Sequence, residues 1–594
     1  MKRVLLQIGA ALALLCVFFA LHRKPARVQA ATQTPPHATL RVGFWTLWHD
    51  REVQLTPAGA ASYRTCASCS AITFSTPITI KASALDGLTL ISAAKQTHAD
   101  VLIFTGPIRI AAHGESELLR YPLTLTARSG ALVMAVELPL ETYVERVVAS
   151  ESGPADTPQS LEALAVAVRS YALHERHGHA GYDLCDSTHC QLLHWHGVPQ
   201  RHNAAHAAAL HTAGETLWFQ NRRALAYFNK DCGGHSASIA DVWPRSPSLA
   251  YLSAHADTYC ARTPSQQWSS DLSRSDLTAA LARRSLAAPG WQHLTVDRRS
   301  GEGRVVTLRA DRTTITAEDF RIAVGEALGW NRVQSNWFEV AERGDRFLFH
   351  GRGSGHGLGL CQKGAAAMGA LGRSSTEILA QYFPGAYAAD EATGKRWNQL
   401  TGEGFVLESL DPADAAFLPD LARARSEASQ RSGLHARTPL RIRAFATTSA
   451  FRNATLAPGW VAAFTEGDWI ATQPLRTLAQ RKLLAATIRH EFLHVLVESE
   501  AGPATPLWLR EGLVEFWSLD PAQQITLRRQ RPNLPLDELE AALMHPSSEG
   551  ESNRAHLEAG LRASQLLDHF GHDQVGRWLH SSIPASALAW LKAQ

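Results

Sequence analysis

The segment containing His490, Glu491 and His494 constrains the fold of this chain more than any other feature. On an α-helix, positions i and i+4 share one face, so both imidazoles can reach one metal ion while Glu491 lies beside it. Such a site needs a third protein ligand and an open position for water, and Glu511 in the segment 508–512 is the candidate ligand. The pattern predicts a helix over residues 481–500, followed at short range by a second glutamate-bearing element.

The chain is long enough to contain domains besides the one that carries this site. A chain of 594 residues is too long for a single hydrophobic core, so we expect two or three domains. The net charge is only +3 and no long basic run occurs, which argues against a polyanion-binding role. Nucleic acid is therefore not an expected partner.

The N-terminus has the pattern of an export segment. Lys2 and Arg3 precede an apolar stretch over residues 4–21, and residues 28–31 are small enough for a cleavage site. The stretch is at the lower limit for spanning a bilayer, so residues 1–30 are expected to be a signal peptide or a membrane anchor. Both alternatives place the remainder in the extracytoplasmic cell envelope, secreted or anchored, with the membrane contacted only through this segment.

Export makes cysteine usage informative. Beyond Cys16 there are seven cysteines, an odd number, so at least one is unpaired or bound to a metal. Cys66 and Cys69 lie in a Ser/Ala-rich loop without a thioredoxin-like context, and we expect a small local disulfide there. Cys232 and Cys260 are isolated in the sequence, and a second disulfide between them is expected.

The hydrophobic patterns predict an α+β protein. Short β-branched and aromatic runs separated by Gly and Pro predict strands and hairpins from residue 40 to about 140. Helical spacing follows over 160–176. Charged, Gly-bearing sequence at 390–402 indicates a boundary, after which we expect an amphipathic helix over 411–433 and a strand over 440–446. The expected domains are a mixed α/β domain at 39–388 and a mainly helical α+β domain at 395–594.

A series of motifs in the first domain carries a family resemblance. In order, they are residues 138–151 (LPLETYVERVVASE), 161–171 (LEALAVAVRSY), 182–191 (YDLCDSTHCQ), 232–235 (CGGH), 241–243 (DVW) and 353–362 (GSGHGLGLCQ). The ordered set resembles the SpoIID/LytB family of stage II sporulation protein D and amidase enhancers. The resemblance implies action on peptidoglycan glycan strands by lytic transglycosylation, or stimulation of a separate cell-wall amidase. Sporulation is not inferred, since the domain occurs outside spore formers.

The same resemblance makes Glu151 the catalytic acid/base. One carboxyl group can protonate the glycosidic oxygen and then accept a proton from the attacking sugar hydroxyl, provided that a partly apolar site raises its pKa. The preceding residues 147–149 are suitably apolar. The alternative is that Glu151 merely caps the turn at Gly153. Glu141 and Glu145, nearby on the same segment, are expected to be surface charges.

Four potential metal ligands occur within twelve positions of the first domain: His179, Cys185, His189 and Cys190. This set suits a tetrahedral, structural Zn²⁺, and the resemblance includes relatives with zinc in this loop. A Cys185–Cys190 disulfide is the alternative. A closed four-ligand site would hold the loop beside the cleft without performing chemistry. His356, in the glycine-rich segment, could line the sugar site or serve as a structural hydrogen-bonding group.

The second domain carries its own resemblance. Residues 487–494 (TIRHEFLH) and 506–516 (PLWLREGLVEF) resemble the gluzincin, or peptidase MA-like, metallopeptidases with a zincin-like fold. The resemblance implies that His490, His494 and Glu511 bind Zn²⁺ and that Glu491 is the general base. Glu515, four residues after Glu511, is expected to orient His490. The alternative is a degenerate peptidase fold retained for binding.

Together these patterns predict an exported protein that acts on peptidoglycan with one domain and as a zinc metallopeptidase with the other. One alternative is a non-catalytic wall-binding factor that stimulates an amidase. Another is a metallopeptidase that uses the first domain as its wall anchor.

Overall fold

The computed structural model describes residues 39–594 except 85, 93–94, 175–177, 197–198, 263, 288, 437–438, 545 and 547; the side chains of 199–202 are also not described. The expected export segment, residues 1–30, lies outside this range. Both parts of the described chain contain strands and helices, which confirms the predicted α+β class. The chain divides into two compact units between Arg396 and Trp397. None of the helices in the described part is both long enough and apolar enough to cross a bilayer.

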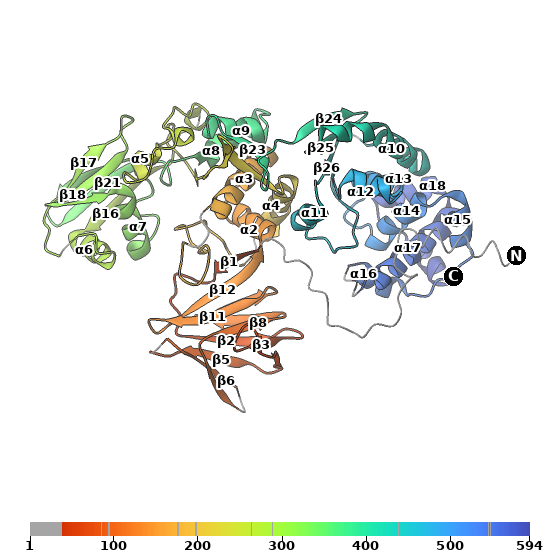
Figure 1. Cartoon of the computed structure of the whole chain (residues 1–594), viewed down its shortest axis with the longest axis horizontal. Coiled ribbons are helices and arrows are strands. Elements are labelled where there is room, and N and C mark those ends of the chain that lie inside the picture. The colour runs from red at the N-terminus through yellow and green to blue at the C-terminus, as the bar shows by residue number, and fades with distance from the viewer. Residues whose placement is uncertain are drawn as a thin grey trace. The chain divides into compact units, whose positions relative to one another are not determined.

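Two six-stranded antiparallel sheets form the beginning of the first unit (red to orange in Figure 1). Their orders are β1-β12-β11-β8-β3-β4 and β10-β9-β2-β5-β6-β7. In most of these strands the alternation of apolar and polar residues places one face in a shared core, as Val53 and Leu55 of β2 illustrate. The strands are β1 (Thr39–Gly43), β2 (Glu52–Pro57), β3 (Ser62–Arg64), β4 (Ile72–Thr73), β5 (Ile78–Ala82), β6 (Leu88–Ile91), β7 (Gln96–Ala99), β8 (Leu102–Thr105), β9 (Ile108–Ala112), β10 (Glu115–Leu119), β11 (Leu123–Arg128) and β12 (Ala131–Pro139).

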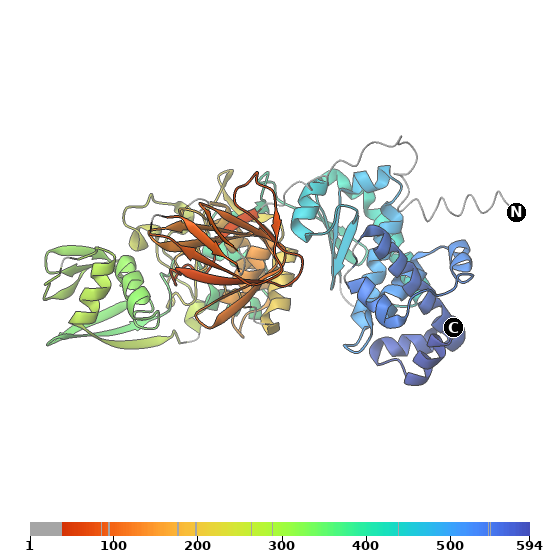
Figure 2. The ribbon, with the colours of Figure 1, turned by 90° about the horizontal axis from the view of Figure 1, so that it is seen from below.

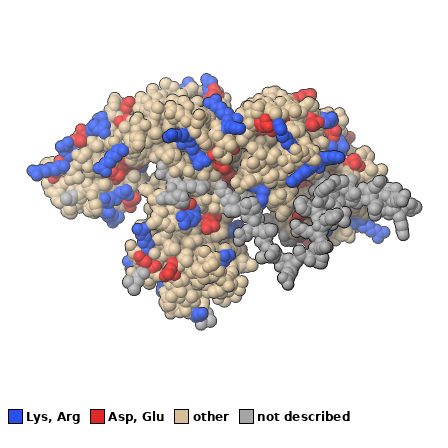
Figure 3. Space-filling model, in the orientation of Figure 1, with Lys and Arg blue, Asp and Glu red and all other residues tan. Residues whose placement is uncertain are grey.

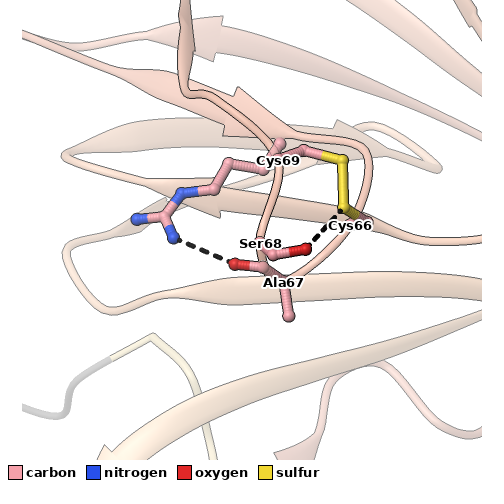
Figure 4. Close-up of a disulfide and its surroundings, with 5 residues drawn as sticks. Cys66, Ala67, Ser68 and Cys69 are labelled. Carbon is pink, nitrogen blue, oxygen red and sulfur yellow. Dashed lines mark hydrogen bonds between the residues drawn. A yellow bond between two sulfur atoms is a disulfide. The ribbon is translucent and has the colours of Figure 1, made fainter.

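The loop between β3 and β4 contains the local disulfide that the sequence predicts. Cys66 and Cys69 are bonded to each other, and Ser68 Oγ lies 3.6 Å from Cys66 Sγ (Figure 4). The Arg64 guanidinium donates to the carbonyl of Ala67 within the same loop. The predicted pairing of these two cysteines is therefore confirmed.

A helical layer follows the sheets and carries most of the recognised motifs. Its helices are α2 (Leu140–Glu151), α3 (Pro158–His174), α4 (Pro199–His211), α8 (Gln362–Ala370) and α9 (Ser375–Tyr382). The helix predicted over 160–176 is α3. Two small sheets accompany these helices: β14 (Arg222–Arg223), β13 (Glu215–Phe219) and β23 (Tyr387–Asp390) in one, and the parallel pair β15 (Phe228–Asn229) and β22 (Leu360–Cys361) in the other.

A buried ion pair joins the helices of this layer. Arg169 of α3 is fully buried, and its Nε and Nη2 lie 2.9 and 2.5 Å from the two carboxylate oxygens of Glu141 in α2. Arg169 also donates to the carbonyl of Ala209 in α4. The expectation that Glu141 is a surface charge is thus wrong, because α3 brings a buried guanidinium against it.

Residues 267–352 form an insertion with its own hydrophobic core (green in Figures 1 and 2). Two three-stranded antiparallel sheets, β16-β21-β20 and β17-β18-β19, pack with two helices. The elements are β16 (Gln267–Ser273), α6 (Arg274–Arg283), β17 (Leu294–Arg299), β18 (Val305–Ala310), β19 (Thr313–Thr316), α7 (Ala317–Leu328), β20 (Phe338–Arg343) and β21 (Arg346–Arg352).

The second unit combines a five-stranded sheet with a group of helices around one core. The sheet order is β24 (Asn398–Gly402), β25 (Phe405–Ser409), β26 (Leu440–Ala444), β28 (Trp469–Thr472) and β27 (Ala463–Glu466); only its two edge strands are antiparallel to their neighbours. The segments predicted at 411–433, 440–446 and 481–500 correspond to α10 (Leu418–Ser432) with a preceding short 3₁₀ turn, to β26, and to α13 (Leu484–Glu500). Further helices include α14 (Leu507–Ser518), α17 (Glu549–Phe570) and α18 (His572–His580).

On the face drawn in Figure 3, basic and acidic side chains of the described residues are interspersed. They do not gather by sign over either unit in that view.

Candidate functional site

A cleft of about 230 Å³ lies in the first unit, and Glu151 is part of its wall. Helices α2, α3 and α7, the loop before α4 and the glycine-rich segment before α8 all contribute to it. Among its described lining residues, Glu151 is the only carboxylate. The lining also includes aromatic and basic side chains, namely Tyr171, Tyr227, Lys230, Arg321 and Trp330. The cleft therefore places a single carboxyl group among aromatic surfaces and cations.

The carboxyl group of Glu151 has an unusual pKa. Burial at the end of α2 raises its pKa from 4.5 to about 7, although the N–H of Leu192, the side chain of Gln362 and the charge of Lys230 act in the opposite direction. The N–H of Leu192 donates to Oε1 over 3.3 Å. The turn after α2 is capped by Asp156, whose Oδ2 lies 2.7 Å from the N–H of Gly153. The turn at Gly153 is therefore capped by Asp156 and not by Glu151.

The four predicted ligands of the cysteine/histidine loop converge in the structure. Each of His179, Cys185, His189 and Cys190 offers one ligand atom, and these atoms all lie within 4.8 Å of one another. His179 Nε2 is 3.1 Å from Cys190 Sγ, and the two Sγ atoms are 3.0 Å apart as free thiols. The hydrogen bond between the two sulfur atoms holds the pKa of Cys185 well below its ordinary value. This donor set fits a tetrahedral Zn²⁺.

The ligand loop continues directly into the wall of the cleft. Cys190 itself lines the cleft, and Leu192, two residues later, supplies the N–H that meets Glu151. Between them, Gln191 is buried and accepts a hydrogen bond from Tyr143 over 2.9 Å. The loop therefore supplies a hydrogen bond to the Glu151 carboxyl group.

His356 both lines the cleft and holds its own loop. Its Nδ1 accepts a hydrogen bond from the N–H of Leu358 over 3.0 Å. Burial lowers its pKa to about 4, against the opposing charge of Glu318, so the imidazole is neutral at pH 7. In the structure His356 therefore both lines the cleft and makes a structural hydrogen bond, so the two predicted roles are compatible.

The expected disulfide between Cys232 and Cys260 is not formed. Both residues are buried free thiols, and so is Cys361. Cys232 Sγ lies 3.3 Å from a carboxylate oxygen of Asp257, and Cys260 Sγ lies 3.2 Å from one of Asp231. The expectation is wrong because neither thiol is isolated in space, and a third cysteine joins them.

The second unit brings together the three predicted ligands of the His490 motif. His490 and His494 project from one face of α13, while Ile488 and Phe492 pack into the core. The two Nε2 atoms are 3.1 Å apart, and His494 Nε2 is 3.7 Å from Oε2 of Glu511 in α14. Burial lowers the pKa of His490 to about 3, which leaves the neutral imidazole that metal binding requires.

Glu491 lies beside these ligands and is held by the edge strand. Thr465 of β27 donates to its Oε2 over 2.6 Å. Burial raises the pKa of Glu491, while the charge of His494 and the bond from Thr465 act against this shift. The residue is thus fixed in position with an elevated proton affinity, which suits proton transfer.

Two neighbours of this site differ from expectation. Ser518 Oγ, rather than Glu515, lies 3.1 Å from Nδ1 of His490. Glu515 faces α17, where Gly560 leaves room for its side chain. His556 of α17, which sequence patterns did not single out, has its Nε2 3.5 Å from Oε2 of Glu511. Ser518 is thus a residue within hydrogen-bond range of the His490 ring that the sequence patterns did not indicate.

Close packing of α14 on α17 brings His556 to the site. A Cβ atom at Gly512 would lie 2.3 Å from the carbonyl oxygen of Ala559, so only glycine permits this approach. Sequence spacing gives no signal for His556, because its proximity to Glu511 depends on this contact between helices.

Comparison with known proteins adds information on the first unit. A family model described as SpoIID, stage II sporulation protein, matches residues 128–219. An uncharacterized protein of Brachyspira hyodysenteriae is 28% identical over 262 residues, covering 44% of this chain and 69% of that protein. Stage II sporulation protein D of Bacillus subtilis is 24% identical, with 46% and 81% covered, and the amidase enhancer of the same organism is 23% identical, with 40% and 39% covered. Residues 128–219 of the first unit thus match the SpoIID family model, and each of these relatives aligns with less than half of the chain.

Proposed function

We propose that the first unit cleaves peptidoglycan glycan strands by lytic transglycosylation, with Glu151 as the acid/base. The observation that carries this proposal is a lone carboxyl group, with a pKa of about 7, in the wall of the cleft. Hydrolytic glycosidases ordinarily use two carboxylates. Among the described lining residues there is no second one, which favours a mechanism with a single group. The stage II sporulation protein D and amidase enhancer relatives support a role at the cell wall.

The proposed cleavage needs two proton transfers, and both involve the carboxyl group of Glu151. Protonated Glu151 donates to the glycosidic oxygen as the bond to the sugar breaks. The resulting carboxylate then accepts the proton of the sugar's own hydroxyl as that oxygen bonds to the anomeric carbon. The product is an anhydro sugar, no water is consumed, and Glu151 ends protonated as it began.

The remaining residues of the cleft position this carboxyl group. Leu192 stabilises its ionised form through one hydrogen bond, and Gln362 holds the end of α2 by donating to the Glu151 carbonyl over 3.4 Å. Tyr227 and Trp330 provide aromatic faces of the kind on which sugar rings pack. A Zn²⁺ held by Cys185, Cys190 and the two histidines would supply rigidity to the loop carrying Leu192.

For the second unit we propose zinc-dependent cleavage of peptide bonds. His490, His494 and Glu511 would hold the ion: two imidazoles and a carboxylate are a donor set that Zn²⁺ accepts, and His494 Nε2 lies 3.1 Å from His490 Nε2 and 3.7 Å from Glu511 Oε2. When bound, Zn²⁺ supplies Lewis acidity to the peptide carbonyl and lowers the pKa of water. Glu491, held by Thr465, takes the proton of the attacking water and passes it to the leaving amine. Ser518 fixes the ring of His490.

A second candidate function for the first unit is stimulation of a separate amidase. The similarity to a protein named amidase enhancer favours it. In that case the cleft would bind glycan without cleaving it. Either function operates in the extracytoplasmic cell envelope.

One digestion separates these functions. Purified peptidoglycan is treated with the full chain and with Glu151→Gln, Glu491→Gln and Glu145→Gln, and the fragments are analysed by mass spectrometry. Glu145, on the same helix as Glu151, pairs with His206 and serves as the matched control. We expect anhydro ends that only Glu151→Gln abolishes, and peptide cuts that only Glu491→Gln abolishes. Intact glycan with all proteins, combined with faster cleavage by an added amidase, would instead establish the enhancer function.

A further inference from the structure

We propose that Cys232, Asp257, Cys260 and Cys361 form a buried site for a thiolate-preferring divalent cation such as Zn²⁺. This site lies in the first unit and is separate from the loop that holds His179 and Cys185. It goes beyond the function proposed above, because it does not depend on cleavage or on amidase stimulation.

The four side chains have the size and chemistry of such a site. Their ligand atoms all lie within 4.8 Å of one another, and all four residues are fully buried. In a tetrahedral zinc site with Zn–S bonds of about 2.3 Å, the ligand atoms are roughly 3.8 Å apart. Three sulfurs and one carboxylate are a donor set that zinc accepts.

The carboxylate is oriented by groups that are not ligands. Asp257 Oδ1 accepts the N–H of Cys260 over 2.8 Å, and Oδ2 accepts the hydroxyl of Tyr382 over 2.9 Å. A Cβ atom at Gly364 would lie 2.0 Å from the Tyr382 hydroxyl and 2.6 Å from Asp257. Supporting hydrogen bonds of this type are typical around metal ligands. Gly364 therefore keeps open the space in which they form.

Charge and backbone geometry also favour anionic sulfur. The N–H of Cys232 points to Sγ of Cys361 over 3.3 Å. Cys361 immediately precedes the N-terminus of α8, where the helix dipole stabilises negative charge. The buried guanidinium of Arg304 donates to the carbonyls of Cys232 and His235. These groups offset part of the negative charge that three thiolates and a carboxylate carry.

The site also accounts for the odd number of cysteines. In the described chain, one pair forms the Cys66–Cys69 disulfide and one pair lies in the histidine loop. Three buried thiols remain, and a disulfide between any two would leave the third unpaired. A bound cation uses all three and protects them from oxidation in an exported protein.

The location suggests what the cation would do. Cys361 ends β22, and the next residue, Gln362, donates to the carbonyl of Glu151. Cys232 follows β15 by a short turn that begins at Lys230, which lines the cleft. A cation bound to both segments would hold the paired strands β15 and β22 together beneath the cleft.

The test uses cobalt(II) as the probe, on the full chain carrying Cys185→Ser and Cys190→Ser. The His490 site contains no thiolate, so thiolate-to-cobalt charge-transfer absorption in this parent can report only the proposed site or other free cysteines. We expect that absorption in the folded parent, its loss in Cys361→Ser, and its persistence when Cys66 and Cys69 are also replaced by Ser. Absence of the absorption in the folded parent would overturn the proposal, whether or not Cys361→Ser folds.

A second measurement uses the unaltered chain. The protein is denatured without reductant, with a chelator and an alkylating agent present, and the cysteines are mapped by mass spectrometry. We expect Cys232, Cys260 and Cys361 all to be alkylated. A disulfide between any two of the three would contradict the site.

Discussion

The main-chain N–H of Leu192 donates to the carboxyl group of Glu151 over 3.3 Å, across a separation of 41 residues. This bond connects the candidate acid at the end of α2 to the loop on which Cys185 and Cys190 converge. It also lowers the pKa of a carboxyl group that burial raises. The predicted metal loop and the predicted catalytic residue are therefore parts of one site.

The first prediction concerns the pH dependence of glycan cleavage. Glu151 must begin protonated, and its pKa is about 7. The rate should therefore be highest below pH 7 and fall about tenfold per pH unit well above it. Rates of anhydro-product formation measured from pH 5 to 9 check this. A rate that is flat across pH 7 would contradict the assignment.

The second prediction concerns stability. Folding raises the pKa of Glu151 from 4.5 to about 7. Ionisation of this carboxyl group therefore has no effect on the free energy of unfolding below pH 4.5, and above pH 7 it destabilises the fold to its full extent. Glu151→Gln cannot ionise and should be more stable than the original chain above pH 7, by up to about 3 kcal/mol. Below pH 4.5 this difference should vanish. Denaturant unfolding of both proteins at pH 4 and pH 8 measures it, and equal stability at pH 8 would show that Glu151 is not desolvated.

The third prediction concerns the cysteine/histidine loop. Replacing His179 with Ala removes a predicted metal ligand that does not itself line the described cleft. Because the loop positions Leu192, glycan cleavage should fall by about 10- to 100-fold. Peptide cleavage by the second unit should not change. Parallel assays of both activities, with Glu145→Gln as the control, check this, and glycan cleavage by His179→Ala at the rate of the original chain would contradict the role of the loop.

The fourth prediction concerns the helix contact behind the second site. Gly512→Ala would place a methyl group 2.3 Å from the carbonyl of Ala559 and force α14 from α17. We expect destabilisation by about 1–3 kcal/mol and weaker metal binding, because Glu511 is the adjacent residue. Gly576 in α18 has no neighbouring atom within 4 Å of its Cβ position, so Gly576→Ala is the matched control. Thermal unfolding and metal titration of both variants measure these effects. Equal stability and equal metal affinity of the two variants would show that the contact between α14 and α17 does not support the site.

The fifth prediction concerns Ser518. Removing its hydroxyl in Ser518→Ala leaves Nδ1 of His490 without the bond that fixes the ring, so metal affinity should fall by about 10- to 100-fold. Ser581→Ala, which removes a hydroxyl bonded to the carbonyl of Arg577, should leave metal affinity unchanged. Equal affinity in both variants would mean that the ring needs no such support.

Features that depend on local pattern were predictable from the sequence. Helical spacing is a property of neighbouring residues, and the segments predicted at 160–176 and 481–500 correspond to α3 and α13. The i, i+4 histidines share a face of α13 for the same reason. The loop ligands His179 to Cys190 are close in sequence, and short loops keep them close in space.

Features that depend on contacts between distant segments were not predictable from the sequence. Cys361 joins Cys232 only because β22 pairs with β15 across more than a hundred residues, so a disulfide of two isolated cysteines was the wrong expectation. Glu141 is buried because Arg169 of another helix reaches it. Ser518 and His556 reach the second site through the packing of α13, α14 and α17, which no sequence spacing encodes.

The most direct test of the central claim follows the oxygen atom that enters the cleaved glycan. Peptidoglycan is digested by the full chain in water labelled with heavy oxygen, and the new sugar ends are weighed by mass spectrometry. Intramolecular attack assisted by Glu151 predicts anhydro ends without the label, and no such ends with Glu151→Gln. Labelled, hydrated ends, or unlabelled anhydro ends that persist in Glu151→Gln, would contradict the account.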